Sequence, residues 1–154
     1  VLGGIQGMFR ELIAQCVSES GAEYAYLEPS CPEDEITQAE NAVGYPFPEE
    51  LKALLRETNG DHWLLWSAKE MVECAERMKV FLDVCDTYEE YLEKVGRHIF
   101  FAGNGCGDYY CYRILPTGMA DGSGVYIWEH ETFESHVVAK DLPDLIRKYY
   151  HGQC

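Results

Sequence analysis

A glycine-rich stretch at residues 103–108, which reads Gly-Asn-Gly-Cys-Gly-Asp, is the part of this sequence that looks most like a catalytic loop. A phosphate-binding loop needs a helix N-terminus directly after its glycines, and usually a lysine, because backbone N–H groups and the helix dipole hold the anion. Here a tyrosine-rich segment of β character follows instead. The pattern therefore predicts a tight turn between two strands at residues 104–107, in which Gly107 and Asp108 are structural.

Cysteine catalysis is the second chemistry that the stretch suggests. A nucleophile elbow around Cys106 needs glycines two positions away on each side, where this chain has Asn104 and Asp108. An approach of His98 to Cys106 across a hairpin would still give an activated thiol, but no third residue is marked to orient the imidazole. We therefore expect no enzymatic activity, and an enzyme that uses Cys106 and His98 is the least favoured reading.

Metal binding and acid–base catalysis have weaker signals. Structural zinc sites usually show paired ligands such as C-x-x-C or H-x-x-x-H, and these spacings do not occur among Cys106, Cys111, His130 and His136. Glu129 and Glu131 place two carboxylates on one face of a predicted strand, as acid–base pairs require, but such pairs arise by chance among 27 acidic residues. We expect no catalytic residue, no metal and no cofactor.

The elements that position these residues begin with helices. Apolar residues at helical spacing predict an amphipathic helix from Phe9 that ends before Ser20. Two short helices joined by a proline corner are predicted within residues 33–58. Capping boxes that start at Ser67 and Thr87 open a longer helix and a shorter one, and the shorter one is closed by Gly96.

Beyond residue 97 the periodicity changes from helical to alternating, which predicts strands. They are expected near His98–Ala102, Asp108–Leu115, Val125–His130 and Ser135–Lys140, with a short aromatic strand earlier at His62–Trp66. Positive φ angles are expected in turns at Asn104-Gly105 and Asp121-Gly122, and a last helix over Pro143–Tyr150 with Asp141 as its cap. This order is typical of an α+β fold, a single domain with a mainly antiparallel β-sheet packed with several helices.

The length of 154 residues agrees with one domain, which we place at residues 8–154. Residues 1–7 are small and apolar and are interpreted as a leader or cloning remnant. The longest apolar runs are far below the roughly 18 residues that a membrane span requires. Seven cysteines, an odd number without paired spacing, are read as reduced thiols, which favours a cytoplasmic location.

The net charge of −15 limits the partners that the chain can have. Nucleic-acid affinity depends on Lys and Arg displacing counterions, so direct binding to DNA or RNA is disfavoured. The same field would speed association with a basic protein, although solubility alone also explains an acidic surface.

Acids interleaved with tyrosines mark the surfaces that we predict for such a partner, because interfaces favour aromatic anchors. One is an acidic helix with Asp83, Asp86, Tyr88, Glu89 and Glu90. The other is the rim of the sheet with Asp108, Tyr109, Glu129 and Glu131. The tryptophans Trp63, Trp66 and Trp128 are expected in the core.

Two spaced motifs carry a family resemblance. The first is Ile36-x-x-x-Glu40-x-x-Val43-Gly44-x-x-Phe47-Pro48-x-x-Leu51-Lys52-x-Leu54-Leu55-x-x-Thr58-Asn59-Gly60, and the second is Ile99-Phe100-Phe101-Ala102-x-Asn104-Gly105-x-Gly107-Asp108-Tyr109-Tyr110. Together with a closing strand and helix in residues 133–150, they resemble the SUKH superfamily over residues 31–150. The helical middle at residues 67–96 is longer than expected for that family.

The resemblance implies a non-catalytic binding domain with no catalytic residue to transfer. Bacterial members of the superfamily are thought to neutralise toxin domains, often nucleases or deaminases, and fungal members act as regulators of glucan synthesis and cell-wall assembly. We therefore expect an immunity-type protein that binds a basic toxin domain, and the alternative is a regulatory or scaffolding module of envelope synthesis. A toxin gene next to the coding sequence would favour the first reading.

Overall fold

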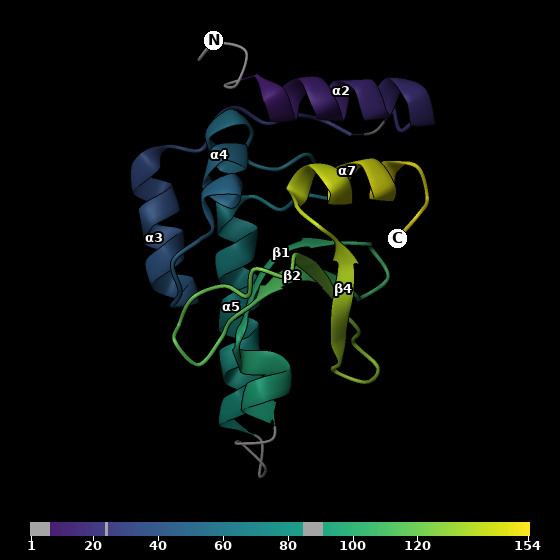
Figure 1. The fold of residues 1–154 in the computed structure, drawn as a ribbon. Helices are drawn as coiled ribbons and strands as arrows, with labels where there is room; N and C mark the ends of the chain where they lie inside the picture. Colours follow the sequence, from purple (N-terminus) through teal and green to yellow (C-terminus); the bar gives the residue numbers. More distant parts are fainter. Residues whose placement is uncertain (1–6, 24, 85–90) are drawn as a thin grey trace.

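The computed structural model describes residues 7–23, 25–84 and 91–154, and it has the predicted α+β fold (Figure 1). Helix α3 (Glu33–Val43) lies beside α5 (Ala68–Asp83), and the sheet lies against the other side of α5. Helix α7 (Leu142–Tyr150) packs between α2 (Met8–Ser20) and the last strand. Apart from a strand predicted at His62–Trp66, the order of the described elements matches the order predicted from the sequence.

The helix boundaries follow from local signals. Helix α2 ends at Gly21 (φ 75°) and α3 at Gly44 (φ 96°), where glycine adopts the left-handed backbone without a Cβ penalty. Helix α4 (Glu49–Glu57) follows the proline corner. The Ser67 hydroxyl accepts a hydrogen bond from the N–H of Glu70, and the Glu70 carboxylate accepts one from Ser67, so the predicted capping box opens α5. These predictions are confirmed.

The helix predicted to open at Thr87 begins outside the described residues. Residues 1–6 of the segment interpreted as a leader or cloning remnant also lie outside them. After the gap, a π-helical turn η1 (Leu92–Gly96) leads into the sheet.

The sheet contains β1 (His98–Gly103), β2 (Tyr109–Arg113), β3 (Val125–Trp128) and β4 (Ser135–Ala139), paired antiparallel in sequence order. All six residues of β1 are buried, because this edge strand is covered on both faces. The larger core joins one face to α2, α3, α4 and α7, with Phe101, Tyr110 and Leu145 in it. A smaller core on the other face contains Cys74, Phe100 and Trp128.

The strand predicted at His62–Trp66 is wrong. Only Leu65 forms an isolated bridge, to Ala102 of β1. The backbone N–H groups of Trp63, Leu64 and Leu65 donate instead to the Asp61 carboxylate, at 2.8–3.0 Å, so they are not available for a ladder. The prediction that all three tryptophans are core residues also fails, since Trp63 is 43% exposed.

The glycine-rich stretch forms the predicted turn between β1 and β2. Gly105 and Gly107 have φ angles of 77° and 101°. The second turn differs from the prediction, because Gly122 is absent from the positive-φ positions and Gly118 and Gly124 take that conformation instead. The hairpin loop is therefore longer than an Asp-Gly two-residue turn.

Replacing Gly107 with valine is expected to lower the free energy of unfolding by about 1 to 3 kcal/mol. A side chain at this φ is strained, and its Cβ would lie 3.0 Å from Nδ1 of His130. Gly105→Val is the matched control, because its φ is also positive but a Cβ there meets open space, so it should cost less. Urea titrations would measure the free energies of unfolding, with the larger loss expected for Gly107→Val. Equal stability of both variants and the parent would refute the prediction.

Six cysteines, at positions 16, 31, 74, 106, 111 and 154, are free thiols. Among the helices that the structure describes, none is long and apolar enough to cross a lipid bilayer.

Candidate protein-binding groove

A groove of about 770 Å³ lies between α3 and α5. Its floor is made of small or apolar residues, chiefly Ala39, Ala42, Ala68 and Val72. Small side chains keep the groove open while the two helices still pack against each other. Carboxylates form its walls, from Glu28, Glu35, Glu70, Glu73 and Glu76, and the basic side chain that joins them is Lys69.

The loop at residues 58–67 closes one end of this groove and is held by its own polar side chains. The Thr58 hydroxyl donates to the carbonyl of Gly60 at 2.7 Å, and the side-chain oxygen of Asn59 accepts from the N–H of Ala68 at 2.8 Å. Asp61 is fully buried and also accepts a hydrogen bond from the Tyr150 hydroxyl at 2.7 Å. These bonds fix the start of α5 relative to α4, and so fix the position of the groove.

Four of the wall carboxylates form no close ion pair within the described part of the chain. Glu35, Glu70, Glu73 and Glu76 are exposed, and none of them takes part in an ion pair among the described residues. Glu35 accepts only the Cys31 thiol, at 3.8 Å, and Glu70 caps α5. The groove is therefore a concentrated negative site with an apolar floor.

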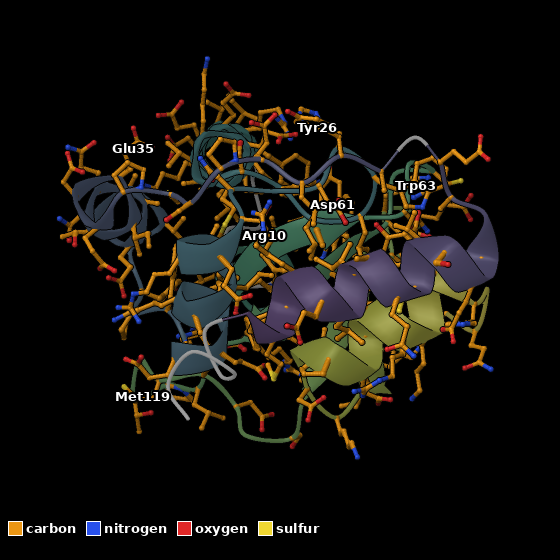
Figure 2. All side chains as sticks on the ribbon, turned by 90° about the horizontal axis from the view of Figure 1, so that it is seen from above. Arg10, Tyr26, Glu35, Asp61, Trp63 and Met119 are labelled. Carbon is orange, nitrogen blue, oxygen red and sulfur yellow. The ribbon has the colours of Figure 1, made fainter. Side chains whose placement is uncertain are left out.

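The fifth carboxylate, Glu28, pairs with His62 at the loop end of the groove. The hydrogen bond that the His62 ring donates to the Glu28 carboxylate raises the pKa of His62. The ring of Tyr26 lies 5.8 Å from the His62 ring and is 62% exposed. In Figure 2, Tyr26 and Glu35 both lie along the upper edge of the molecule, with Glu35 farther to the left, and Asp61 lies below Tyr26. An exposed aromatic ring at the end of an acidic groove is the composition expected of an interface anchor.

A model of the SMI1/KNR4 family (SUKH-1) matches residues 30–148. The chain belongs to this family. Among curated proteins, none matches the sequence. The two motifs that carried the resemblance lie on α3, α4 and the following loop, and on β1, the glycine turn and β2. The end of the first motif, Thr58-Asn59-Gly60, coincides with the residues whose hydrogen bonds hold the groove loop of this SUKH-1 chain.

The residues predicted for the sheet rim of the SUKH-1 domain lie at or beside the β1–β2 turn and the β3–β4 turn. Asp108 lies in the glycine turn, and its carboxylate accepts hydrogen bonds from the backbone and ring nitrogens of His130, at 3.1 and 2.7 Å. This bond lowers the pKa of Asp108. Asp108 is thus structural, as the sequence predicted, and its charge is already paired with a neighbour.

Tyr109 and the two rim glutamates take different positions. Tyr109 stacks on Trp128 with ring centroids 5.6 Å apart, so its ring belongs to an internal aromatic cluster. Glu129 and Glu131 follow the end of β3 and lie in the β3–β4 turn, not on one face of a strand as predicted. Because Tyr109 pairs with Trp128, all four residues lie at one end of the sheet.

The predicted acidic helix is divided. Asp83 is the exposed last residue of α5, whereas Asp86, Tyr88, Glu89 and Glu90 lie outside the described residues. Phe81 on the same turn as Asp83 contacts Phe133 of the β3–β4 turn at 5.4 Å, so this end of α5 adjoins the rim.

The described residues do not support catalysis by His98 and Cys106, nor a metal site made of Cys106, Cys111, His130 and His136. His98 begins β1 and Cys106 follows its other end, so they are separated by roughly the 20 Å length of a six-residue strand. Cys111 is fully buried, while His130 is engaged by Asp108 and His136 is exposed on β4. Neither the predicted thiol–imidazole pair nor these four possible ligands come together.

The groove itself was missed by the sequence reasoning. Its residues come from positions 28–42 and 59–76, and the acids among them recur every three or four residues on α5, as on any solvated helix face. The motif Thr58-Asn59-Gly60 marked the loop, but the pairing of α3 with α5 could not be read from it.

Proposed function

We propose that this SUKH-1 chain is a non-catalytic protein-binding domain that holds a basic segment of a partner protein in the groove between α3 and α5. The observation that carries the proposal is the set of exposed carboxylates, Glu35, Glu70, Glu73 and Glu76, without ion-pair partners in the described chain. Charges of one sign in a concave site attract the opposite charge more strongly than the same charges on a flat surface.

The shape of the groove favours a protein segment over a small ligand. Its apolar floor of alanine and valine accepts the methylene groups of lysine or arginine side chains, while their charged ends reach the glutamates on the walls. Tyr26 at the loop end supplies a ring for an apolar contact or for a cation–π contact with the same basic side chains.

Within the family, this arrangement supports an immunity-type role. A toxin that acts on nucleic acid carries a basic surface for phosphate, and carboxylates that occupy this surface would block it by imitating the phosphate charge. The alternative is a regulatory or scaffolding module of cell-wall or glucan synthesis, which would use the same groove for a basic segment of an envelope-synthesis protein. A toxin reading frame beside the coding gene would favour immunity, and an envelope operon would favour regulation.

Reversal of the groove charge is expected to slow association with the toxin domain encoded beside the gene by at least tenfold at low salt. The variant is Glu35→Lys, Glu73→Lys and Glu76→Lys, which leaves Glu70 in its capping role. These side chains are exposed, so stability should change little. Stopped-flow or surface-plasmon kinetics at low and high salt would measure the rate, and the difference from the parent should shrink as salt rises.

The matched control carries the same change of net charge at the surfaces predicted from sequence, through Asp83→Lys, Glu129→Lys and Glu131→Lys. It should slow association much less than the groove variant. Tyr26→Ala should mainly raise the dissociation rate. If the control is slowed and the groove variant binds as the parent does, the partner occupies the sheet rim and the groove assignment is wrong.

A further inference from the structure

A cluster of three metal-ligand side chains lies where α2 meets the end of α7, and it shares no residue with the groove. Cys16 and Glu19 come from the last two turns of α2, and His151 follows the last residue of α7. The thiol sulfur, a carboxylate oxygen and an imidazole nitrogen all lie within 4.8 Å of one another. The two helices run side by side in both views (Figures 1 and 2).

The imidazole is oriented in the way that metal-binding histidines are. Nδ1 of His151 lies 2.7 Å from the backbone carbonyl of Arg147 and donates its hydrogen to it. The other ring nitrogen, Nε2, faces Glu19 at 3.3 Å from Oε1, so a cation bound between them would contact both side chains. A backbone carbonyl that fixes the tautomer in this manner is the usual second contact of a zinc-bound histidine.

The surroundings differ for the three groups. Cys16 is 1% exposed, whereas the side chains of Glu19 and His151 are 49% and 37% exposed and lie over the thiol. In a tetrahedral zinc site, sulfur, nitrogen and oxygen ligands are separated by roughly 3.3 to 3.8 Å. The three donor atoms lie within 4.8 Å of one another, so none of these separations exceeds the zinc-bound range by more than about 1.5 Å.

We propose that Cys16, Glu19 and His151 form a zinc-binding site, with a water molecule as the fourth ligand. Thiolate, imidazole and carboxylate are the three donor types that zinc takes in proteins, and three protein ligands plus water is a known coordination for this ion. On binding, the Cys16 thiol loses its proton to solvent and the sulfur forms the bond to zinc, with no change in oxidation state. The last turn of α2 also presents the negative end of its helix dipole to the cation.

The site would clamp the N-terminal helix to the C-terminal one. Helix α2 and the segment after α7 lie at opposite ends of the sequence, so a metal that bridges them closes almost the whole chain into one loop. Such a bridge stabilises the folded state because the unfolded chain lacks the preformed set of ligands.

Cobalt substitution tests the proposal with a readout that reports the thiolate directly. Titration of the parent with Co²⁺ should produce a sulfur-to-cobalt charge-transfer band with one ion per chain, and Zn²⁺ should displace it. The band should disappear in Cys16→Ser. In His151→Gln, an exposed change that leaves the fold intact, the affinity for Zn²⁺ should fall at least tenfold.

The controls replace cysteine and histidine side chains outside the cluster. Cys106→Ser, Cys154→Ser and His136→Gln should keep the band and the affinity, because these side chains lie elsewhere. A parent that gives no charge-transfer band at millimolar Co²⁺ would overturn the proposal. So would a band that survives in both Cys16→Ser and His151→Gln, since another cysteine would then hold the metal.

Discussion

Replacement of Asp61 with alanine is expected to lower the free energy of unfolding by about 4 kcal/mol. One carboxylate oxygen accepts three backbone N–H groups, from residues 63, 64 and 65, and the other accepts the Tyr150 hydroxyl. Asp61 is completely buried, so the alanine variant removes the acceptor of the buried N–H groups of Leu64 and Leu65 and of the Tyr150 hydroxyl, where water does not replace it. Chemical denaturation followed by tryptophan fluorescence would measure the change.

Two further variants separate the contributions of the Asp61 oxygens. Asp61→Asn keeps one acceptor for the backbone N–H groups and should cost clearly less than the alanine. Tyr150→Phe removes only the hydroxyl bond and should cost about 1 kcal/mol.

Asp121→Ala is the matched control, because Asp121 also accepts a backbone N–H, from Ser123, and a tyrosine hydroxyl, from Tyr126. It lies at the surface, where water replaces the lost bonds. Equal losses for Asp61→Ala and Asp121→Ala would contradict the role of burial.

Stability is expected to fall as the pH is lowered from about 6.5 to about 4, and His98 accounts for about 3 kcal/mol of this loss. The ring is 4% exposed, and burial, together with the charge of Arg113, lowers the pKa of His98 from 6.5 to about 4. In this range the unfolded chain binds a proton that the folded chain does not. Protonation therefore favours the unfolded state, and the stability of the neutral histidine is fully present only above pH 6.5.

Denaturant titrations between pH 4 and pH 7.5 would measure this dependence in the parent and in His98→Gln. The variant cannot titrate at this position. Its free energy of unfolding should therefore fall by about 3 kcal/mol less than that of the parent over this pH range. The difference between the two slopes removes the contributions of all other groups. A slope that is unchanged in His98→Gln would mean that the histidine is protonated in the folded protein.

The local elements could be predicted because their signals are local. The stripe of Phe9, Leu12, Ile13 and Cys16 predicted α2, and all four residues are buried. The caps at Ser67 and Asp141 predicted where two helices start. They could be recognised in the sequence because each capping bond joins residues only three positions apart. The strand prediction at 62–66 failed for a related reason, because aromatic residues suggested β structure and the capping side chain of Asp61 was overlooked.

The main helices, the four-stranded antiparallel sheet, the glycine turn and the family could be predicted from the sequence, since periodicity, caps and spaced motifs are properties of neighbouring residues. Only the tertiary structure decided which surfaces these elements form together. It placed α3 against α5 to make the acidic groove, joined Asp61 to Tyr150, and brought Cys16 to His151. Helix packing sets these contacts between residues distant in the chain, and amphipathic periodicity states which face of a helix is buried but not which helix covers it.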